Sequence, residues 1–493
     1  MSVARAIVRG TSRVLAGSVV ARVLDFAYFL LLARALGVQR FGLLAFAIAY
    51  TLMFGVLADL GITTVFTRDV AREPRRARAL LGDAVALKLV LGAATIAGSA
   101  LVCRWTRLAG AEVTVPLLLL ATSLVLTSFA VLFQGLLKAA NRGGAVGVAV
   151  ATKSLVTLGS GAMLLASGAG LRGAALAFVI GSVAQLAVSV APCRDLLAAA
   201  DPAPPGWRAG RSQRARGLLA AALPLAVSGA FITLYFRVDS VLLQAMKGAA
   251  DVGLYGGVYR FFEAVTLVGA AYHSIAFPYM ARAADGPPET LRVMWRRSFR
   301  AHLIVSLGLA VFATAFARPI VTLLLGPAYA PAAGALAVLI WAAPGSLVAA
   351  TLFHLLVAQG RPAAAARAVG ITAAFNVALN LALIPAWSYR GAAVATVASE
   401  LVCFVLLYRA FGARVPRPGI AAVVWRPAAA AVLFAGALAY AAPRVPAGTP
   451  AFAIACAACA AAWSLLLVAT RAVGRDDWEL LRAALPGRAA ANR

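Results

Sequence analysis

The chain has 493 residues, of which 63% are hydrophobic and only 13% are charged. A soluble domain is about half apolar and about a quarter charged, so this composition excludes a water-soluble protein and predicts one that crosses a membrane many times. The net charge of +28 does not indicate nucleic-acid binding, because the charges lie in short segments between apolar runs and no hydrophilic domain carries them.

Fourteen apolar segments follow one another along the chain, each close to the 20 or so residues that a transmembrane helix needs. They are predicted at residues 14–33, 41–66, 80–103, 115–137, 144–168, 172–193, 217–243, 254–278, 301–323, 333–357, 363–384, 391–411, 427–442 and 450–470. Arg22 and Asp25 interrupt the first segment, and another follows at once, so we interpret it as an uncleaved transmembrane helix and not as a signal peptide. The predicted fold class is an all-α polytopic membrane protein.

The distribution of basic residues predicts the orientation. With the N-terminus in the cytoplasm and an even number of spans, 31 of the 45 Lys and Arg residues fall in cytoplasmic segments and 9 on the opposite side. Cytoplasmic loops of membrane proteins carry such an excess. We therefore expect a multi-pass protein of the plasma (inner) membrane with both termini in the cytoplasm.

The longest polar stretch, residues 194–216, contains the proline-rich run from Asp201 to Gly206 and is predicted to be a cytoplasmic linker. It would separate an N-lobe of six helices (1–193) from a C-lobe of six helices (217–412). Residues 413–493 would form helices 13 and 14 and a cytoplasmic tail.

Short motifs recur in the two predicted lobes at a nearly constant spacing. Leu36-Gly37 and Phe41-Gly42-Leu43 match Lys247-Gly248 and Val252-Gly253-Leu254, which lie 211 residues later. Two further pairs match at spacings of 219 and 218: Leu136-Leu137 before Arg142 with Leu355-Leu356 before Arg361, and the run from Leu171 to Ala175 with that from Tyr389 to Ala393. A duplicated lobe of six helices keeps its orientation, so the copies would be related by a pseudo-two-fold axis along the membrane normal.

Ten charged residues within the predicted spans are the candidate functional groups, because a charge there costs several kcal/mol unless it faces a cavity or a partner. The basic ones, assigned to a cationic substrate-binding cavity, are Arg22, Lys88, Lys153, Arg237 and Arg260. The acidic ones, assigned to ion coupling or gating, are Asp25, Asp59, Asp239, Glu263 and Glu400.

The spacing of these charges suggests how they are used. Arg22 and Asp25, like Arg260 and Glu263, are three residues apart on one helical face, where they either form an internal pair or face the cavity. Lys88 and Lys153 have no acidic residue within one helical turn. We expect Lys88 either to reach the cytoplasmic surface or to point inward with Lys153. Two inward lysines would suit an anionic substrate such as a phosphate or pyrophosphate.

Asp59 is expected to contact the basic loop that follows its helix, and Glu400 and His273 are expected to make helix-packing hydrogen bonds or to bind a proton or ion. The three histidines, His273, His302 and His354, lack the spacing of metal ligands. No catalytic constellation or Walker loop is present, so no enzyme activity, metal or cofactor is predicted.

Several of these short motifs resemble the polysaccharide-biosynthesis O-antigen flippase (Wzx-like) family of the multidrug/oligosaccharidyl-lipid/polysaccharide exporter superfamily. They are Leu32-Ala33-Arg34-Ala35-Leu36-Gly37, Phe41-Gly42, Ala58-Asp59-Leu60-Gly61, Thr67-Arg68-Asp69-Val70-Ala71, Leu324-Leu325-Gly326-Pro327-Ala328-Tyr329 and Gln359-Gly360-Arg361-Pro362. The resemblance implies two six-helix lobes, a cationic central cavity, and alternating access for a polyprenyl-pyrophosphate-linked oligosaccharide used in cell-surface polysaccharide synthesis.

The resemblance also implies partner proteins and alternative functions. The polysaccharide polymerase and glycosyltransferases of the same route are expected partners. A drug/cation antiporter of the same superfamily and a lipid II flippase, in which two extra C-terminal helices help to form a lipid-binding groove, are the alternatives. A membrane-bound glycosyltransferase or ligase is a rival of another class, and the short outer loops argue against it.

Overall fold

The computed structural model describes residues 3–106, 110–202, 207, 210–412, 419–445 and 448–473, and this part of the chain is helical apart from short connections. The longer helices are α1 (Val3–Asp59), α2 (Ile62–Arg72), α3 (Ala77–Thr106), α4 (Ala111–Ala139), α5 (Gly143–Ala166), α6 (Gly170–Val190), α8 (Arg211–Lys247), α9 (Ala249–Ala284), α10 (Pro288–Ala315), α13 (Ala342–Ala358), α14 (Pro362–Phe411), α15 (Ile420–Ala441) and α16 (Thr449–Ala469). Short helices complete the set: α7 (Arg194–Ala198), α11 (Ala317–Leu324), α12 (Ala333–Leu339), and the 3-10 turns η1 (Pro74–Arg76), η2 (Ala191–Cys193), η3 (Pro327–Ala332) and η4 (Ala442–Arg444). The predicted all-α fold is confirmed.

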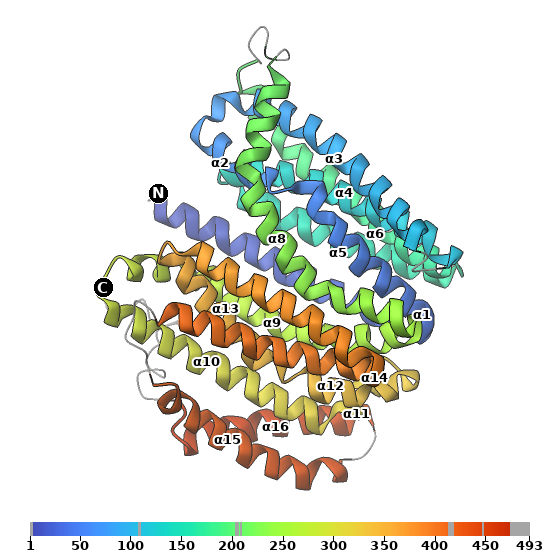
Figure 1. Ribbon diagram of the computed structural model, residues 1–493, viewed down its shortest axis with the longest axis vertical. Coiled ribbons are helices and arrows are strands. Elements are labelled where there is room, and N and C mark those ends of the chain that lie inside the picture. Colours follow the sequence, from blue (N-terminus) through green and yellow to red (C-terminus); the bar gives the residue numbers. More distant parts are fainter. Residues whose placement is uncertain are drawn as a thin grey trace. The chain divides into compact units, whose positions relative to one another are not determined.

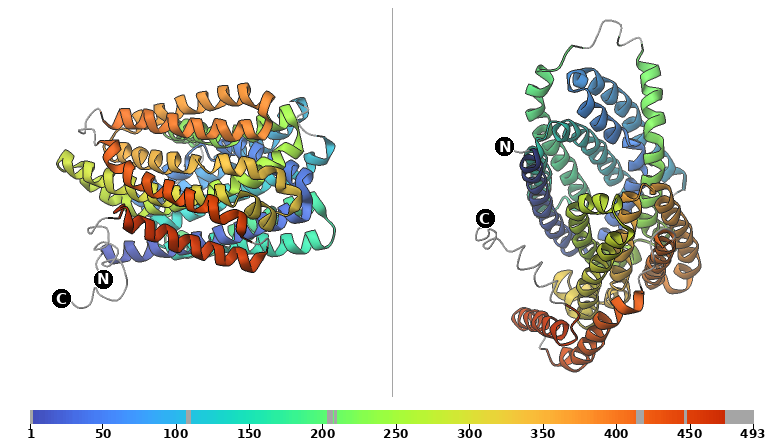
Figure 2. Two further views of the ribbon diagram at one scale, coloured as in Figure 1. Left: turned by 90° about the horizontal axis from the view of Figure 1, so that it is seen from below. Right: turned by 90° about the vertical axis from the view of Figure 1, so that its left-hand side faces the viewer.

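The chain divides into two compact units, of which the first is Met1–Gly257 with Ala373–Ala392 and the second is Val258–Thr372 with Ala393–Arg493. Helices α3 to α6 pack side by side in the first unit, and α15 lies beside α16 in the second (Figures 1 and 2). The lobe boundaries expected from the linker stay predictions.

All fourteen predicted apolar segments fall mainly on helices, and those at 41–66 and 301–323 each run across a short break, at Leu60-Gly61 and at Phe316. Within the described residues, nine helices are long and apolar enough to cross a membrane, or eleven if each of two bent pairs is one span. Two of them, α1 with 57 residues and α14 with 50, are each long enough for two crossings and are kinked at Gly37 and Ser388. Each therefore corresponds to two of the predicted segments.

The structure also moves several predicted boundaries. Helix α10 begins at Pro288 and not near residue 301, because Pro288 stands in the first turn, where a missing N–H is tolerated. Helix α15 begins at Ile420, which places Arg426 inside the helix and not in a loop. The segment predicted at 333–357 breaks between α12 and α13. The predicted cytoplasmic tail from 474 onward, and residues 203–206 and 208–209 of the predicted linker, lie outside the described part.

The predicted repeat has a counterpart in the backbone. Gly37 (φ 69°, ψ 173°) and Gly248 (φ 91°, ψ −176°) share one left-handed, extended conformation at the spacing of 211. Asn141 and Gly360, at a spacing of 219, have φ of 56° and 70°. Gly170 and Ser388, at a spacing of 218, have φ of 53° and 49°. Positive φ is uncommon outside glycine, so its recurrence at the repeated motifs supports a duplicated set of helix connections.

The starts of the two repeats meet in a reciprocal contact. A Cβ atom added to Gly42 would collide with the backbone carbonyl of Ala249, and one added to Gly253 would collide with that of Val38. Ala249 follows Val38, and Gly253 follows Gly42, by the same 211 residues. Glycine is required at both positions because the backbones of α1 and α9 approach this closely.

The polar linker is anchored to the first unit. Asp83 of α3 accepts hydrogen bonds from Trp207 Nε1 (3.0 Å), Arg211 Nε (3.2 Å) and Arg214 Nε (2.7 Å). Arg211 and Arg214 belong to the first turn of α8. The end of the predicted linker is therefore helical and is held by a buried carboxylate.

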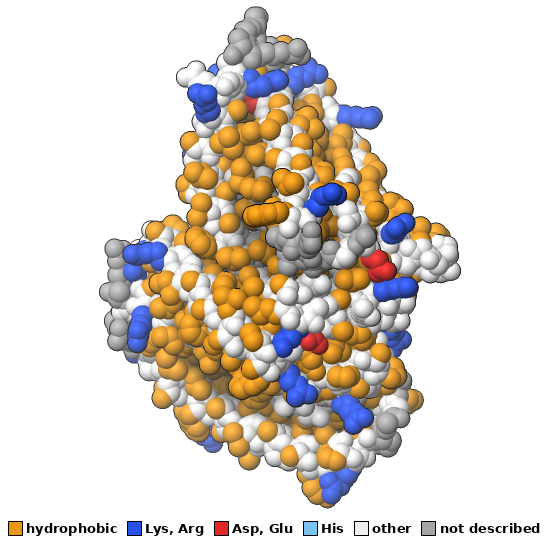
Figure 3. Space-filling view, turned by 45° about the vertical axis from the view of Figure 1, so that its right-hand side comes forward, with side chains coloured by type: hydrophobic (Ala, Val, Ile, Leu, Met, Phe, Trp, Pro, Cys, Tyr) orange, Lys and Arg blue, Asp and Glu red, His pale blue; other side chains and the backbone are white. Residues whose placement is uncertain are grey.

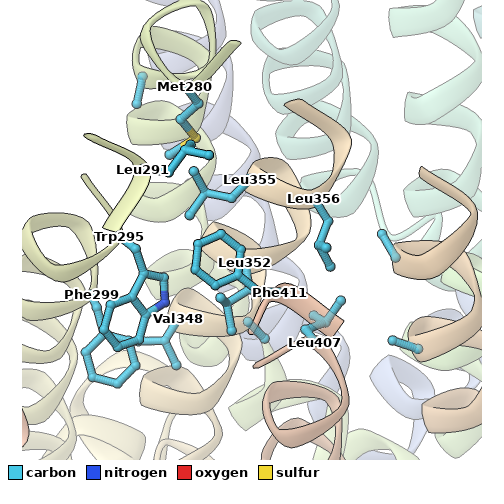
Figure 4. Packing of buried hydrophobic residues seen from close by; sticks show 14 of the residues in the cluster. Met280, Leu291, Trp295, Phe299, Val348, Leu352, Leu355, Leu356, Leu407 and Phe411 are labelled. Carbon is cyan, nitrogen blue, oxygen red and sulfur yellow. The ribbon is translucent and has the colours of Figure 1, made fainter. Parts of the chain in front are cut away.

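Each unit has its own apolar core, and hydrophobic side chains also cover the outside. In the second unit, Trp295 and Phe299 of α10 pack with Leu352 and Leu355 of α13 (Figure 4). The face in Figure 3 is dominated by hydrophobic side chains, and large ones such as Val432 are exposed. A surface of this kind is expected where lipid, not water, surrounds the helices.

Candidate functional site

Lys88 of α3 is buried, with 1% of its surface exposed, and it is ion-paired. Its Nζ lies 2.5 Å from Asp59 Oδ1 at the end of α1, and it donates to Ser128 Oγ (2.6 Å) and Ser128 O (2.9 Å) of α4. The acidic partner of Lys88 comes from another helix, beyond the one helical turn within which the sequence offers none. Asp59, expected to contact the basic loop, instead pairs with Lys88 and accepts a hydrogen bond from Thr63 Oγ1.

Lys153 of α5 is half-buried, and its environment is different. Its Nζ donates to Thr127 Oγ1 at 2.9 Å. The charges of Asp25 and Arg22 on α1 both act on it electrostatically. The structure therefore brings together two of the predicted basic residues and one predicted acid, with one positive charge in excess.

Arg22 and Asp25 themselves are exposed, and no ion pair joins them in the described part of the chain. Arg22 lies 15 residues before the kink at Gly37, roughly 22 Å along the helix, and so well inside the span. A bare charge at this depth is costly in lipid. We therefore favour the reading in which these side chains face water or substrate over an internal pair.

Helix α4 links the two lysine sites. Its neighbouring residues Thr127 and Ser128 bind Lys153 and Lys88, respectively. Thr127 Oγ1 also lies 3.0 Å from Ser182 Oγ of α6, and Ser182 lies 2.7 Å from Ser123 Oγ. Sequence reasoning missed these hydroxyl residues. Their signal is the four-residue spacing of Ser123 and Thr127 on one face of an apolar helix.

Asp239 of α8 is 2% exposed and lies in the first unit. It accepts a hydrogen bond from Tyr255 Oη of α9 (2.6 Å) and another from the Ser240 backbone N–H (2.6 Å). The charge of Arg237, which is half-buried, acts on the same carboxylate. This carboxylate is held by several donors, as buried charges usually are.

The remaining candidates lie in the second unit. Arg260 NH1 lies 2.7 Å from Glu263 Oε2, so the predicted internal pair is present. Glu400 of α14 is 3% exposed and packs against Gly345 of α13. The three histidines are far apart in the sequence, but their rings stack on one another in this unit.

These features define a class of protein. Helices that cross a membrane many times carry charges in their interior, and two similar sets of connections repeat along the chain. This is the construction of a secondary transporter.

Comparisons with known proteins give the family. A family model described as polysaccharide biosynthesis protein matches residues 7–284, which is more than half of the chain, and the chain belongs to that family. A second model, MatE, matches residues 224–382. The EPS I polysaccharide export inner membrane protein EpsE of Ralstonia solanacearum is 26% identical over 319 residues, which is 60% of this chain and 69% of that protein.

Solved structures share the fold. The lipid II flippase MurJ in an inward closed conformation has a TM-score of 0.76 at 12% identity, over 94% of this chain and 99% of its own. An inward-facing multidrug resistance transporter of the MATE family has a TM-score of 0.67 at 14% identity, over 79% of this chain and 94% of its own. The protein is thus a multi-pass membrane transporter of the polysaccharide-biosynthesis family, and it is not an enzyme.

Proposed function

We propose that the protein moves a polyprenyl-pyrophosphate-linked oligosaccharide across the inner membrane by ion-coupled alternating access. The two termini lie in the cytoplasm, and the two six-helix lobes, 1–193 and 217–412, move around the substrate. The polysaccharide polymerase and glycosyltransferases that use the same lipid carrier are its functional partners.

The observation that carries this proposal is the excess positive charge around Lys153. Lys153 and Arg22 share one acid, Asp25, whereas Lys88 is neutralised by Asp59 and Arg260 by Glu263. A pyrophosphate needs cations that are not already paired. Lys153 and Arg22 are therefore the primary anion-binding residues, and Lys88 supports the site through its ion pair with Asp59.

The acidic candidates for coupling also differ in their surroundings. Asp59 and Glu263 are in ion pairs, Asp239 is held by Tyr255, and Glu400 is buried. Asp25 is exposed beside the proposed anion site. Of the five, Asp25 is the one whose charge acts on Lys153, so it is the acid that would respond to a bound pyrophosphate and couple substrate binding to the charge of the site.

A lipid II flippase is the second candidate, and the coverage of the fold favours it. The match to MurJ includes 94% of the chain. At most about 30 of the 493 residues then lie outside it, which is fewer than the 43 residues of α15 and α16 together, so at least part of this helix pair belongs to the shared architecture. The matched MATE transporter covers only 79%. In the proposed function, α15 and α16 line the path of the lipid tail.

Binding to the purified protein distinguishes these candidates. Thermal stabilisation is measured with undecaprenyl-pyrophosphate-linked sugar, with lipid II and with a cationic drug. The comparison is between the wild type, Lys153→Met and Lys138→Met, the last removing an exposed lysine from the final turn of α4. We expect the lipid-linked sugar to stabilise the wild type and Lys138→Met but not Lys153→Met. Stabilisation by lipid II alone would favour the second candidate, and stabilisation by the drug alone would make the protein an antiporter.

A further inference from the structure

All three histidines of the 493-residue chain converge on one place in the second unit. His273 comes from α9, His302 from α10 and His354 from α13. The ring of His273 is stacked on that of His354, with centroids 4.4 Å apart and planes 2° apart, and it is stacked on that of His302 at 5.2 Å and 21°. His273 and His302 are 2% and 4% exposed.

One hydroxyl group joins two of the rings. Thr351 Oγ1 of α13 lies 3.0 Å from His273 Nε2, 3.1 Å from His302 Nδ1 and 3.2 Å from the carbonyl oxygen of Leu347. A hydroxyl has one hydrogen to donate and two lone pairs that accept. Three contacts can therefore all be hydrogen bonds only if the threonine donates once and accepts twice.

We infer that His273, His302, His354 and Thr351 form a one-proton site whose protonation couples transport to proton movement. The role of the proton in transport rests on the proposed function. The binding of the proton to the site does not depend on that function. The site is distinct from the acidic residues considered above.

In both protonation states the Thr351 hydroxyl has an acceptor for its own hydrogen and can bond both ring nitrogens that face it. In the neutral state, His302 Nδ1–H donates to Thr351 and the threonine hydroxyl donates to His273 Nε2. When His273 Nε2 takes a proton from the aqueous phase, it becomes a donor. Thr351 then accepts from both rings, and its own hydrogen turns to the Leu347 carbonyl, which is already in place. No covalent bond other than the new N–H forms or breaks.

The stacking limits the site to one extra proton. His354 donates Nδ1–H to the Ala350 carbonyl (2.8 Å), since a carbonyl only accepts. A second imidazolium 4.4 Å from the first would place two like charges face to face in a poorly solvated interior. His302 Nε2 is buried and has no hydrogen-bond partner among the described residues, so it is a poor place for an added N–H.

The arrangement suits a proton better than a metal ion. Metal ligands point their lone pairs at one centre, whereas the nitrogens of parallel stacked rings lie in separate planes. Within the described residues, no group of three histidine, cysteine or acidic side chains could hold a metal. Histidine is the side chain whose charge changes within the physiological pH range.

The position of the cluster lets a proton reach it and lets its charge act on the packing of the surrounding helices. His354 is half-buried and lies one turn before the end of α13 at Ala358, so it is the entry side. On the inner side, Tyr272 contacts the ring of His302 (4.7 Å) and belongs to the shell of the core drawn in Figure 4. A change of charge here alters the packing of α9, α10 and α13 against one another.

Other titratable groups on the surrounding helices set the field that the proton meets. The titratable groups that face the His273 ring are His354 and His302. Helix α13 carries no Lys, Arg, Asp or Glu, and Glu400 of α14 packs against Gly345, six residues before Thr351. The other charged and titratable side chains of these helices within the second unit are Tyr259, Arg260, Glu263, Tyr272, Tyr279 and Arg282 of α9, Glu289, Arg292, Arg296, Arg297 and Arg300 of α10, Arg367, Cys403, Tyr408 and Arg409 of α14, and Arg426 and Tyr440 of α15.

The first test observes proton binding directly. Because the chain has three histidines, selective 15N-histidine labelling of the tag-free protein gives three ring systems to follow by NMR between pH 5 and pH 8. We expect the uptake of one proton per chain in wild type. We expect this titration to be lost in His273→Gln and Thr351→Val and kept in Thr351→Ser, which retains the hydroxyl. Three unchanged rings over this range in wild type would overturn the inference.

The second test asks whether the proton drives transport. Export of lipid-linked oligosaccharide is measured in proteoliposomes with and without an imposed pH gradient. We expect the gradient to change the wild-type rate by about fivefold or more. The change should vanish in Thr351→Val and persist in Thr372→Val, a matched buried threonine of α14 that donates to the Ala368 carbonyl of its own helix and also bonds the side chain of Cys403.

The outcomes separate the two proposals. Export that occurs without a gradient but is insensitive to one, in a protein whose cluster titrates, overturns the coupling role and leaves the proposed function intact. A protein that moves no lipid-linked oligosaccharide under any condition contradicts the proposed function, and the NMR titration still decides whether the proton site exists.

Discussion

The polar interiors of the two units differ in the kind of charge they hold. In the first unit, the amino groups of Lys88 and Lys153 are anchored by Asp59, Ser128 and Thr127. In the second unit, the polar centre is a stack of imidazoles joined by a neutral hydroxyl. Lysine side chains suit the binding of an anion, whereas an imidazole stack suits a change of charge. The comparison suggests that one unit binds the substrate and the other responds to protons, and four predictions test it.

Asp59→Asn should have the largest effect on stability. It leaves the Lys88 ammonium, whose side chain is 0% exposed, without its counter-charge. Removing one partner of a buried pair costs about 3–5 kcal/mol, and because Asp59 is about one-third exposed we expect about 3 kcal/mol. The measurement is thermal unfolding in detergent. Lys88→Met combined with Asp59→Asn should restore most of the loss, and a double variant as unstable as the single one would show that Lys88 is not the cause.

Gly42→Ala and Gly253→Ala should come next, and they should have similar effects. Each new Cβ collides with a backbone carbonyl, that of Ala249 or of Val38, and neither carbonyl can rotate away as a side chain would. Overpacking of this kind costs about 1–3 kcal/mol. Gly82→Ala is the control, because a Cβ there meets nothing within 4 Å. A large difference between the two variants in thermal unfolding would contradict the reciprocal contact of the repeats.

Thr351→Val should have a smaller effect on stability, which sharpens the contrast between the units. It removes neutral hydrogen bonds and leaves no charge unpaired, so we expect a loss of about 1 kcal/mol in the same unfolding assay. A loss as large as that of Asp59→Asn would mean that the histidine cluster is mainly a structural support of the second unit.

Glu289→Gln should have the smallest effect. Its partner Arg292 lies 3.3 Å away on the same helix, and Glu289 is exposed. Exposed pairs of this kind contribute at most about 1 kcal/mol and often nothing measurable. Unfolding within error of the wild type is expected, and a clear loss would show that the end of α10 makes contacts beyond this pair.

The sequence predicted most of the fold because the lipid environment leaves few alternatives. Spans of apolar residues must satisfy their own backbone hydrogen bonds, so the fourteen segments became helices. The repeated glycines at 37 and 248 were visible as motifs, and both have the left-handed backbone that such motifs require. The predicted boundaries were wrong where helices continue beyond the apolar run, as at Pro288 and Ile420, since helix ends outside the hydrophobic segment are set by local contacts.

The sequence predicted which charged residues lie within the spans, but it did not predict which of them form ion pairs with one another. A search within one helical turn found the Arg260–Glu263 pair, whose partners share a helix face. It did not find the partner of Lys88, because Asp59 is 29 residues away and is brought close only by the packing of α1 against α3.

The sequence by itself determined the class of protein, the helical fold, the duplicated motifs and the set of buried charges, because hydropathy and the cost of charge in lipid act on each segment independently. Only the tertiary structure decided which charges neutralise one another and that the three histidines meet. Those decisions depend on contacts between helices that are distant along the chain, such as the hydroxyl of Thr351 between His273 and His302.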